Sequence, residues 1–328
     1  MRVLVCGGAG YIGSNMTAML AAEGHQPVVF DNLSKGHKAA IVKEAQFVKG
    51  DLSDYELLVK TLKKHKVDAV MHFAAFIEVV ESVQFPLKYY HNNVSNTQTV
   101  LNAMETAGVE KFVFSSTAAV YGIPKKVPIT EDSHKEPINP YGETKLASEQ
   151  ICHWQCRSGK LRYAALRYFN AAGAGFNGSL GEDHKPESHL IPLIIFTAMG
   201  KSNSVKIYGT DYDTPDGTCI RDYIHIEDLC SAHLLALKKL EEQRELIYNL
   251  GNGKGYSVRE VIETVKKVSG RNFKVVETDR RQGDPAVLTS DATKAENQLG
   301  WKKKYTLLET IVETAWKFHN KYPNGYPD

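Results

Sequence analysis

The chain has 328 residues and a formal net charge of +2, with 42% hydrophobic and 24% charged residues. This is the profile of an ordinary globular protein, and its length fits two domains or one large one. The balanced charge speaks against nucleic acid as a partner, no apolar run reaches the ~20 residues of a membrane span, and no signal peptide is expected because an apolar strand pattern begins directly after Met1.

The chain opens with a short apolar run, Arg2–Cys6. Glycines follow at positions 7, 10 and 13, and a helical pattern then continues to about Glu23. Glycine at these positions permits a tight strand-to-helix turn and a close approach of the backbone to a pyrophosphate. The loop predicts a nucleotide site, with a purely structural glycine turn as the alternative, since its spacing is one residue wider than the usual fingerprint.

A second strand pattern, Pro27–Phe30, ends at Asp31. A carboxylate in this position accepts hydrogen bonds from an adenosine ribose and repels a 2′-phosphate. The sequence therefore favours NAD over NADP as cofactor. The neighbouring Lys35 and Lys38 weaken this preference, and a simple turn residue is the alternative interpretation of Asp31.

Strand and helix patterns then alternate along the first half of the chain. Strands are expected at 46–50, 68–73 and 111–114, and helices at about 54–65 and 84–107. This alternation indicates an α/β fold with a parallel, doubly wound Rossmann sheet, which binds ligands outside the carboxyl ends of its strands. The residues expected at those ends are Asp51, Phe73, Ala74, Ala75, Ser115 and Thr117. His72 is expected to be a packed residue at a strand end and not a catalyst.

Tyr141 and Lys145 lie one helical turn apart at the start of a further helical pattern. Their Cβ atoms would be roughly 5–6 Å apart on one helix face. An ammonium group at that distance favours phenolate over phenol, so we expect a lowered pKa for Tyr141 and a base for a sugar hydroxyl. A solvated helix face is the alternative for the pair taken alone.

The second half of the chain continues the α/β pattern. Strands are expected at 166–169 and 246–250, helices at about 189–200, 227–240, 257–269 and 306–320, and a glycine-rich loop over the substrate at 173–186. We predict an NAD-binding Rossmann domain over residues 1–170. A smaller α/β substrate domain is predicted over 171–328, with segments that cross back to the core.

The five cysteines bear on the compartment. Cys152 and Cys156 are one helical turn apart, and the other three are scattered. Their spacing predicts neither a disulfide framework nor a zinc site. We therefore expect no metal and a protein of the reducing cytoplasm.

These motifs, in this order, resemble the extended short-chain dehydrogenase/reductase family over essentially the whole chain. The resemblance narrows to the UDP-galactose (UDP-glucose) 4-epimerases in Ser115–Gly122, Asn139–Lys145, Arg167–Asn170, Asp211–His225 and the ending Gly325–Asp328. It implies reversible 4-epimerisation of UDP-galactose and UDP-glucose in galactose metabolism, through a transient 4-keto sugar and NADH. It also implies tightly retained NAD and a homodimer formed through helices near 84–107 and 141–158.

The resemblance further implies a role for individual residues. Tyr141 would be the catalytic base, Lys145 would bind the nicotinamide ribose, and Thr117 would bridge the sugar 4-hydroxyl and the tyrosine. Cofactor contacts are implied for Gly7, Gly10, Tyr11, Ile12, Gly13, Asp31, Asn32, Asp51, Leu52, Phe73, Ala74, Ala75, Asn92, Ser115, Tyr141, Lys145 and Phe169. Substrate contacts are implied for Thr117, Asn170, His189, Leu190, Lys206, Tyr208, Arg221, Tyr223, Arg281, Asp284 and Leu288.

Three positions depart from the pattern of the resembling proteins. Ile77 stands where some members carry a lysine near the cofactor, and His189 stands where asparagine is frequent beside the diphosphate. Leu288 stands at the sugar pocket, where a large tyrosine restricts some members to hexoses without a 2-acetamido group. Because leucine is smaller, we expect some activity on UDP-N-acetylhexosamines.

Other functions fit parts of the pattern. A nucleotide-sugar 4,6-dehydratase needs an acid–base pair where this chain has Ala118 and Ala119, and alanines cannot move protons. A 4-epimerase for UDP-pentoses or UDP-uronates needs the same catalytic groups and stays open. A non-catalytic NAD-binding regulator could dispense with Tyr141 or Lys145, and both are present.

Overall fold

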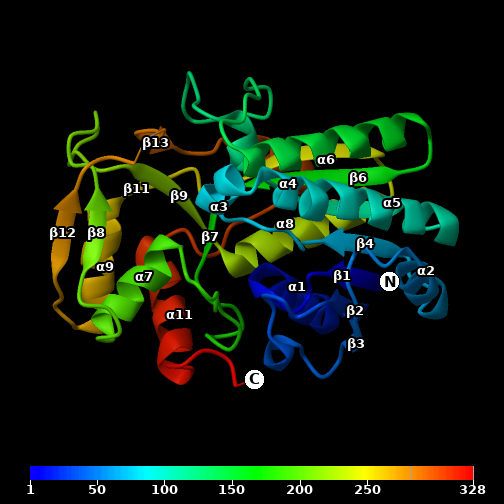
Figure 1. The fold of residues 1–328 in the computed structure, drawn as a ribbon, viewed down its shortest axis with the longest axis horizontal. Helices are drawn as coiled ribbons and strands as arrows, with labels where there is room; N and C mark the ends of the chain where they lie inside the picture. Colours follow the sequence, from blue (N-terminus) through cyan, green and yellow to red (C-terminus); the bar gives the residue numbers. More distant parts are fainter. Residues whose placement is uncertain (282, 328) are drawn as a thin grey trace.

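The structure is a computed structural model that describes residues 1–281 and 283–327. Asp328, the last residue of the ending named above, lies outside the described residues. A large parallel sheet with helices on both faces forms one part of the molecule, and a smaller α/β unit lies beside it (Figure 1). No helix among the described residues combines the length and the apolar character needed to cross a membrane.

The large sheet is entirely parallel, as the sequence predicts, with the order β10-β6-β5-β4-β1-β2-β3. The strand order reverses between β1 and β4, and parallel sheets bind ligands in the crevice at such a reversal. The strands are β1 (Arg2–Cys6), β2 (Gln26–Asp31), β3 (Gln46–Lys49), β4 (Ala69–His72), β5 (Lys111–Thr117), β6 (Arg162–Tyr168) and β10 (Glu245–Leu250).

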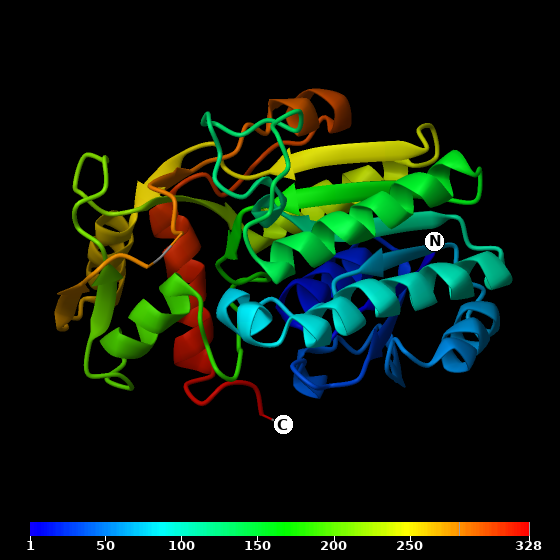
Figure 2. The same cartoon turned by 45° about the horizontal axis from the view of Figure 1, so that its top comes forward.

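The sheet is buried on both faces, which explains why its strands are nearly continuous apolar runs. In β1, Val3 and Val5 point into one hydrophobic cluster, and Leu4 and Cys6 point into the other. One face is covered by α1 (Tyr11–Ala22) and α8 (Ile226–Lys239), with α10 (Thr293–Leu299) against α8, and the other by α2 (Tyr55–Lys64), α5 (Asn96–Ala107) and α6 (Pro140–Arg157) (Figure 2).

The region after β4 differs from the single helix that the sequence predicts over 84–107. It contains α3 (Val79–Gln84), α4 (Pro86–Tyr89), a π-helical turn (Tyr90–Ser95) and then α5. Proline at the first position of α4 has no N–H to continue the preceding helix, so the chain breaks there. Asn92 of this π-helical turn lines the first of the two cavities described below. Such turns are frequent at functional sites.

The smaller unit contains the elements that sequence patterns predict least well. Its hydrophobic core lies among the helices α7 (Leu190–Ala198), α9 (Val258–Ser269) and α11 (Leu308–Lys321), all of which the sequence predicts. The strands missed are β7 (Asn170–Ala172), β8 (Val205–Tyr208), β9 (Ile220–His225), β11 (Gly255–Ser257), β12 (Val275–Thr278) and β13 (Val287–Leu288); α10 is missed too. β7, β11 and β13 have only two or three residues, too few for a period to be recognised. In β8, β9 and β12 charged residues interrupt the apolar run: Lys206, Arg221, Asp222 and Glu277.

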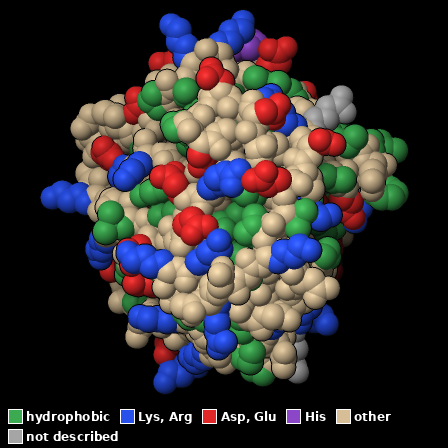
Figure 3. Space-filling model, turned by 90° about the vertical axis from the view of Figure 1, so that its left-hand side faces the viewer, with side chains coloured by type: hydrophobic (Ala, Val, Ile, Leu, Met, Phe, Trp, Pro, Cys, Tyr) green, Lys and Arg blue, Asp and Glu red, His purple; other side chains and the backbone are tan. Residues whose placement is uncertain are grey.

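Two elements of the second half of the chain pack on the large sheet. Strand β10 extends the sheet beside β6, and α8 packs against α1. All five cysteines are buried and free, which agrees with the absence of a disulfide framework. On the end of the molecule that faces the viewer in Figure 3, basic and acidic side chains are interspersed, without the single-sign field of a nucleic-acid interface.

Candidate active site

Two adjoining cavities open at the carboxyl ends of the sheet strands. The first has a volume of about 470 Å³ and extends from the glycine loop to the start of α6. The second, of about 440 Å³, lies against the smaller unit. Asn170, His189 and Arg221 line both cavities. A molecule that spans them would therefore contact both parts of the protein.

The glycine loop between β1 and α1 forms one wall of the first cavity. Gly7 has a φ of +76°, and a Cβ atom there would lie 2.6 Å from the backbone nitrogen of Ala74. A Cβ atom at Gly13 would lie 2.0 Å from the carbonyl oxygen of Gly7. Side chains at these positions would push the turn apart, so glycine keeps the start of α1 close to the cavity. The first N–H groups of any helix have no partner within it, and those of α1 are therefore available to an anionic ligand.

Asp31 ends β2 beside this loop and is buried. Its two carboxylate oxygens accept hydrogen bonds from the backbone N–H groups of Ala9 at 3.0 Å and Leu33 at 2.8 Å. Burial nevertheless raises the pKa of Asp31. The carboxylate thus braces the loop and, because each oxygen can accept a second bond, can also receive a ribose hydroxyl.

Three candidate catalytic residues meet at the other end of the first cavity. Thr117 ends β5, and Tyr141 and Lys145 lie in the first turns of α6, whose first helical residue is Pro140. The side chain of Asn139 caps this helix by accepting a hydrogen bond from the Gly142 N–H at 2.9 Å. The cap fixes where the helix begins, and therefore where the tyrosine and the lysine lie.

The lowered pKa that the sequence predicts for Tyr141 is wrong for this geometry. Burial raises the pKa of Tyr141, and a hydrogen bond with Thr117 opposes that rise. Lys145 is buried as well, and burial lowers its pKa to about 7. Its ammonium group donates a hydrogen bond to the Ser115 carbonyl at 2.8 Å. Desolvation by burial is the leading cause for both groups, so each favours its neutral form.

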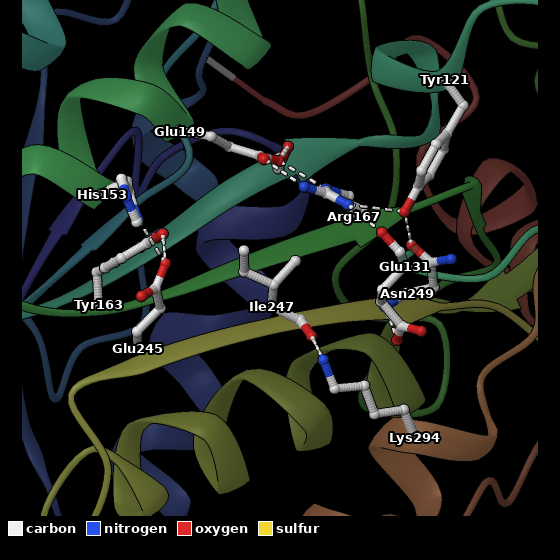
Figure 4. A network of polar contacts seen from close by, with 11 residues as sticks. Tyr121, Glu131, Glu149, His153, Tyr163, Arg167, Glu245, Ile247, Asn249 and Lys294 are labelled. Carbon is white, nitrogen blue, oxygen red and sulfur yellow. Dashed lines mark hydrogen bonds and ion pairs between the residues drawn. The ribbon is translucent and has the colours of Figure 1, made fainter. Parts of the chain in front are cut away.

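A buried polar network holds α6 against the sheet (Figure 4). Glu149, one turn after Lys145, accepts two hydrogen bonds from the guanidinium of Arg167, at 2.9 Å and 2.6 Å. Arg167 also donates to the hydroxyl of Tyr121 at 2.9 Å, and this hydroxyl donates to Asn249 at 2.7 Å. The network joins β6, α6 and β10, and thereby fixes the helix that carries the candidate base.

The second cavity contains two arginines in different surroundings. The Arg221 guanidinium forms an ion pair with Asp284 and donates to the Ile220 carbonyl at 2.8 Å. The Arg281 guanidinium lies over the ring of Tyr208, 3.9 Å from its centroid. Stacking leaves the edge of a guanidinium free to donate, which suits a diphosphate.

The family of the chain follows from comparison with known proteins. The model of the NAD dependent epimerase/dehydratase family matches residues 3–251. The chain belongs to this epimerase/dehydratase family.

Similar proteins cover essentially the whole chain. The UDP-glucose 4-epimerase of Lactobacillus helveticus is 50% identical over 329 aligned residues, 100% of each chain. The crystal structure of UDP-glucose 4-epimerase from Brucella ovis in complex with NAD has a TM-score of 0.94 and 47% identity, and covers 97% of this chain and 98% of that chain. The UDP-Glc/GlcNAc 4-epimerase of Campylobacter jejuni has a TM-score of 0.86 and 46% identity, with 98% and 99% covered.

Every site residue that the sequence suggests for this chain lines at least one of the two cavities. All the cofactor candidates, with Thr117, Ile77 and Leu288, line the first cavity. Asn170, His189 and Arg221 line both. The remaining substrate candidates line the second cavity: Leu190, Lys206, Tyr208, Tyr223, Arg281 and Asp284. The roles of these residues stay predictions.

Several residues around the site were not predicted from the sequence. Glu182 lines both cavities and His184 lines the first, and both lie in the loop expected over the substrate. Glu149 lies on α6, the helix of the candidate residues Tyr141 and Lys145, and pairs with the Arg167 guanidinium of β6. No short-range pattern joins Glu149 to Arg167, because their contact depends on how α6 packs on β6. His72, expected to be a packed residue, is buried against the rings of Phe112 and Phe114.

Proposed function

We propose that the protein is an NAD-dependent UDP-glucose 4-epimerase, which interconverts UDP-galactose and UDP-glucose. The observation that carries the proposal is that Thr117, Tyr141 and Lys145 line the first cavity, which adjoins the second. One cavity has the glycine loop and acidic strand end that suit a dinucleotide, and the other has arginines that suit a diphosphate. Relatives at up to 50% identity carry the same activity in their names.

NAD fits the first cavity. The free N–H groups at the start of α1 suit its pyrophosphate, and Asp31 suits its adenosine ribose while repelling a 2′-phosphate. Lys145 and Tyr141 line the same cavity, and we place the nicotinamide beside them. When bound, NAD supplies the acceptor for a hydride from C4 of the sugar. A positive charge beside Tyr141 would also favour the phenolate that burial alone disfavours.

The chain's own residues supply the proton transfer. Tyr141, as phenolate, takes the proton of the sugar 4-hydroxyl, and Thr117 positions that hydroxyl by its hydrogen bond with the tyrosine. Loss of the proton and of a hydride leaves a 4-keto sugar. After the sugar turns over, Tyr141 would give the proton back to the 4-oxygen, and the opposite face of C4 would receive the hydride from bound NADH. The two transfers balance, so no external oxidant would be needed.

Turning the sugar requires a firm hold on the nucleotide and a loose hold on the hexose. Arg221 and Arg281 line the second cavity and offer guanidinium groups to the diphosphate. Uniformly tight binding of the sugar would slow its rotation without lowering the reaction barrier. Phe169 and Leu288, which line the first cavity, offer the hexose apolar contacts without hydrogen bonds, in agreement with that requirement.

The test is conversion of UDP-galactose by purified protein without added cofactor, followed by chromatography of the UDP-hexoses. We expect UDP-glucose to appear and bound NAD to be released on denaturation. No conversion even with NAD supplied would overturn the assignment. Conversion of UDP-arabinose or UDP-glucuronate alone would instead favour the pentose or uronate 4-epimerase.

We also propose turnover of UDP-N-acetylhexosamines. Leu288 lies on β13 beside Arg221 of β9 and lines the first cavity with Phe169. The Leu288→Tyr variant would narrow this place, so we expect it to lose UDP-GlcNAc turnover by at least about tenfold while keeping UDP-galactose turnover, since steric pocket differences discriminate roughly 10–200-fold. Absence of UDP-GlcNAc turnover in the wild type would refute the proposal.

A cytoplasmic homodimer completes the proposal. Exposed apolar side chains gather near the helices predicted for the interface: Leu87 is 82% exposed and Trp154 is 70% exposed. Large exposed apolar groups are typical of contact surfaces. Light scattering after gel filtration should give twice the chain mass, and Trp154→Glu should weaken the dimer. Five free cysteines agree with a reducing compartment.

A further inference from the structure

The loop between the two cavities concentrates charge in a small, partly buried volume: Glu182 and Glu187 are 6% and 3% exposed, and His184 and His189 are 19% and 41% exposed. Glu182, His184, Glu187 and His189 each offer one donor atom, and these atoms all lie within 4.8 Å of one another. Glu182 and His189 line both cavities. The proposed chemistry uses neither carboxylate of this cluster, so its composition calls for another explanation.

The spacing of the donors matches a tetrahedral site. The His189 Nδ1 lies 2.7 Å from Glu182 and 3.3 Å from Glu187, and the His184 Nδ1 lies 3.1 Å and 3.8 Å from the same two carboxylates. Ligands at about 2.0–2.1 Å from a tetrahedral ion are roughly 3.3 Å apart. The observed separations bracket this value, so small side-chain shifts would bring all four donors to bonding distance.

The cluster also contains polar atoms without satisfactory partners. The Glu187 side chain is only 3% exposed, and its Oε2 atom and the His184 Nδ1 form no hydrogen bond of acceptable geometry with the described residues. The other Glu187 oxygen accepts hydrogen bonds from the backbone N–H groups of Ser188 at 2.7 Å and His189 at 2.8 Å. The carboxylate is therefore held in place while one oxygen still lacks a partner.

The arrangement of the four side chains gives a second reason. The Glu182 and Glu187 carboxylates, 6% and 3% exposed, face two imidazole rings whose centroids are 5.4 Å apart. A divalent cation between them would neutralise both carboxylates and use one nitrogen of each ring as a ligand.

Neighbouring contacts anchor the loop on which the ligands lie. The Gly181 N–H donates to the Tyr326 hydroxyl at 3.0 Å, and the Tyr326 N–H donates to Asp183 at 2.9 Å. At the other end, the Ser188 hydroxyl donates to Glu78 at 2.9 Å. An ion bound here would find its ligands already close to their final positions.

We propose that Glu182, His184, Glu187 and His189 bind one divalent transition-metal ion of the zinc class. Two imidazole nitrogens with two carboxylate oxygens suit zinc, whereas magnesium and calcium prefer oxygen ligands alone. Four protein ligands leave no position that a reaction would need, so the ion is structural. It would fasten the loop between the cavities to the first residues of α7. The cysteine spacing has no bearing on this site, because no cysteine takes part.

The first test is zinc titration of tag-free wild-type protein after removal of metal with a chelator, followed by calorimetry. We expect one zinc ion per chain, a higher unfolding temperature with zinc than with magnesium, and the intense visible absorption of tetrahedral cobalt when Co²⁺ replaces zinc. No stoichiometric uptake of zinc by the wild type would overturn the proposal and leave the cluster as buried ion pairs.

A variant pair tests the position of the site. His184→Asn with Glu187→Gln should weaken zinc binding by roughly 100-fold or more, since even residues behind the ligands contribute 10–100-fold. The matched control is His134→Asn with Glu136→Gln, an exposed pair with its nitrogen and oxygen 3.6 Å apart. Equal zinc affinity in wild type and the ligand variant, shown to be folded by circular dichroism, would contradict the assignment. If the ligand variant does not fold, the wild-type stoichiometry and the cobalt spectrum decide.

Discussion

Tyr141 and Lys145 place two ionisable groups in one buried environment. Burial raises the pKa of the phenol and lowers that of the ammonium group to about 7, so both groups favour their neutral forms. In the proposed reaction the phenolate is the active form. Its population grows as the pH rises through the pKa of Tyr141, so kcat/KM should increase from acidic toward alkaline pH.

Removal of the Tyr141 hydroxyl tests this role directly. We expect Tyr141→Phe to lower kcat by about 10³, because a positioned general base contributes roughly 10²–10⁴. NAD content should stay the same, since the ring is retained. The control is Tyr212→Phe, which removes a buried hydroxyl that lies outside both cavities and has no partner among the described residues. Equal kcat values for Tyr141→Phe and this control would exclude Tyr141 as the base.

At the scale of single elements, α6 depends on the buried pair of Glu149 and Arg167. Both side chains are at most 5% exposed. Removing one partner leaves the other charge buried, which costs about 3–5 kcal/mol. We therefore expect Arg167→Met to lower the free energy of unfolding by about that amount in urea titrations, and to lower kcat because α6 carries Tyr141 and Lys145.

A second variant distinguishes an unpaired charge from lost packing. Arg167→Met combined with Glu149→Leu should recover much of the stability, because no charge is left buried. The half-exposed pair of Lys160 and Glu105 is the control, and Lys160→Met should cost less than about 1 kcal/mol. A double variant no more stable than Arg167→Met alone would mean that packing, and not the isolated carboxylate, causes the loss.

The elements also differ in how far the sequence predicts them. The apolar run Arg2–Cys6 is β1 with the predicted bounds, since a strand buried on both faces is apolar throughout. The two-residue strand Val287–Leu288 has no pattern of its own and exists because β9 lies beside it. Sequence motifs predict the candidate site residues. They do not predict the contact between Glu182 and His189, because it depends on how an irregular loop folds back.

Over the whole molecule, buried neutral histidines couple stability to pH. Burial lowers the pKa of His72 to about 3 and that of His225 and His233 to about 4. The unfolded chain, with histidine pKa values near 6.5, binds these protons more readily than the folded protein does. The contribution of these histidines to the free energy of unfolding is therefore complete above about pH 6.5, and it is lost as the pH falls toward their pKa values in the folded protein.

His233→Asn isolates one of these contributions. The His233 Nδ1–H donates to the Leu229 carbonyl at 2.9 Å, and the ring packs against Phe73 and Tyr168, so asparagine can keep the hydrogen bond without titrating. From pH 7 to pH 5, each buried histidine should cost about 2 kcal/mol of unfolding free energy, and the variant should lose about 2 kcal/mol less than the wild type. Urea unfolding at the two pH values measures this difference, with the exposed His134→Asn as control. An identical loss in His233→Asn and the wild type would show that the imidazole of His233 takes up its proton without unfolding, and that acid destabilisation originates at other groups.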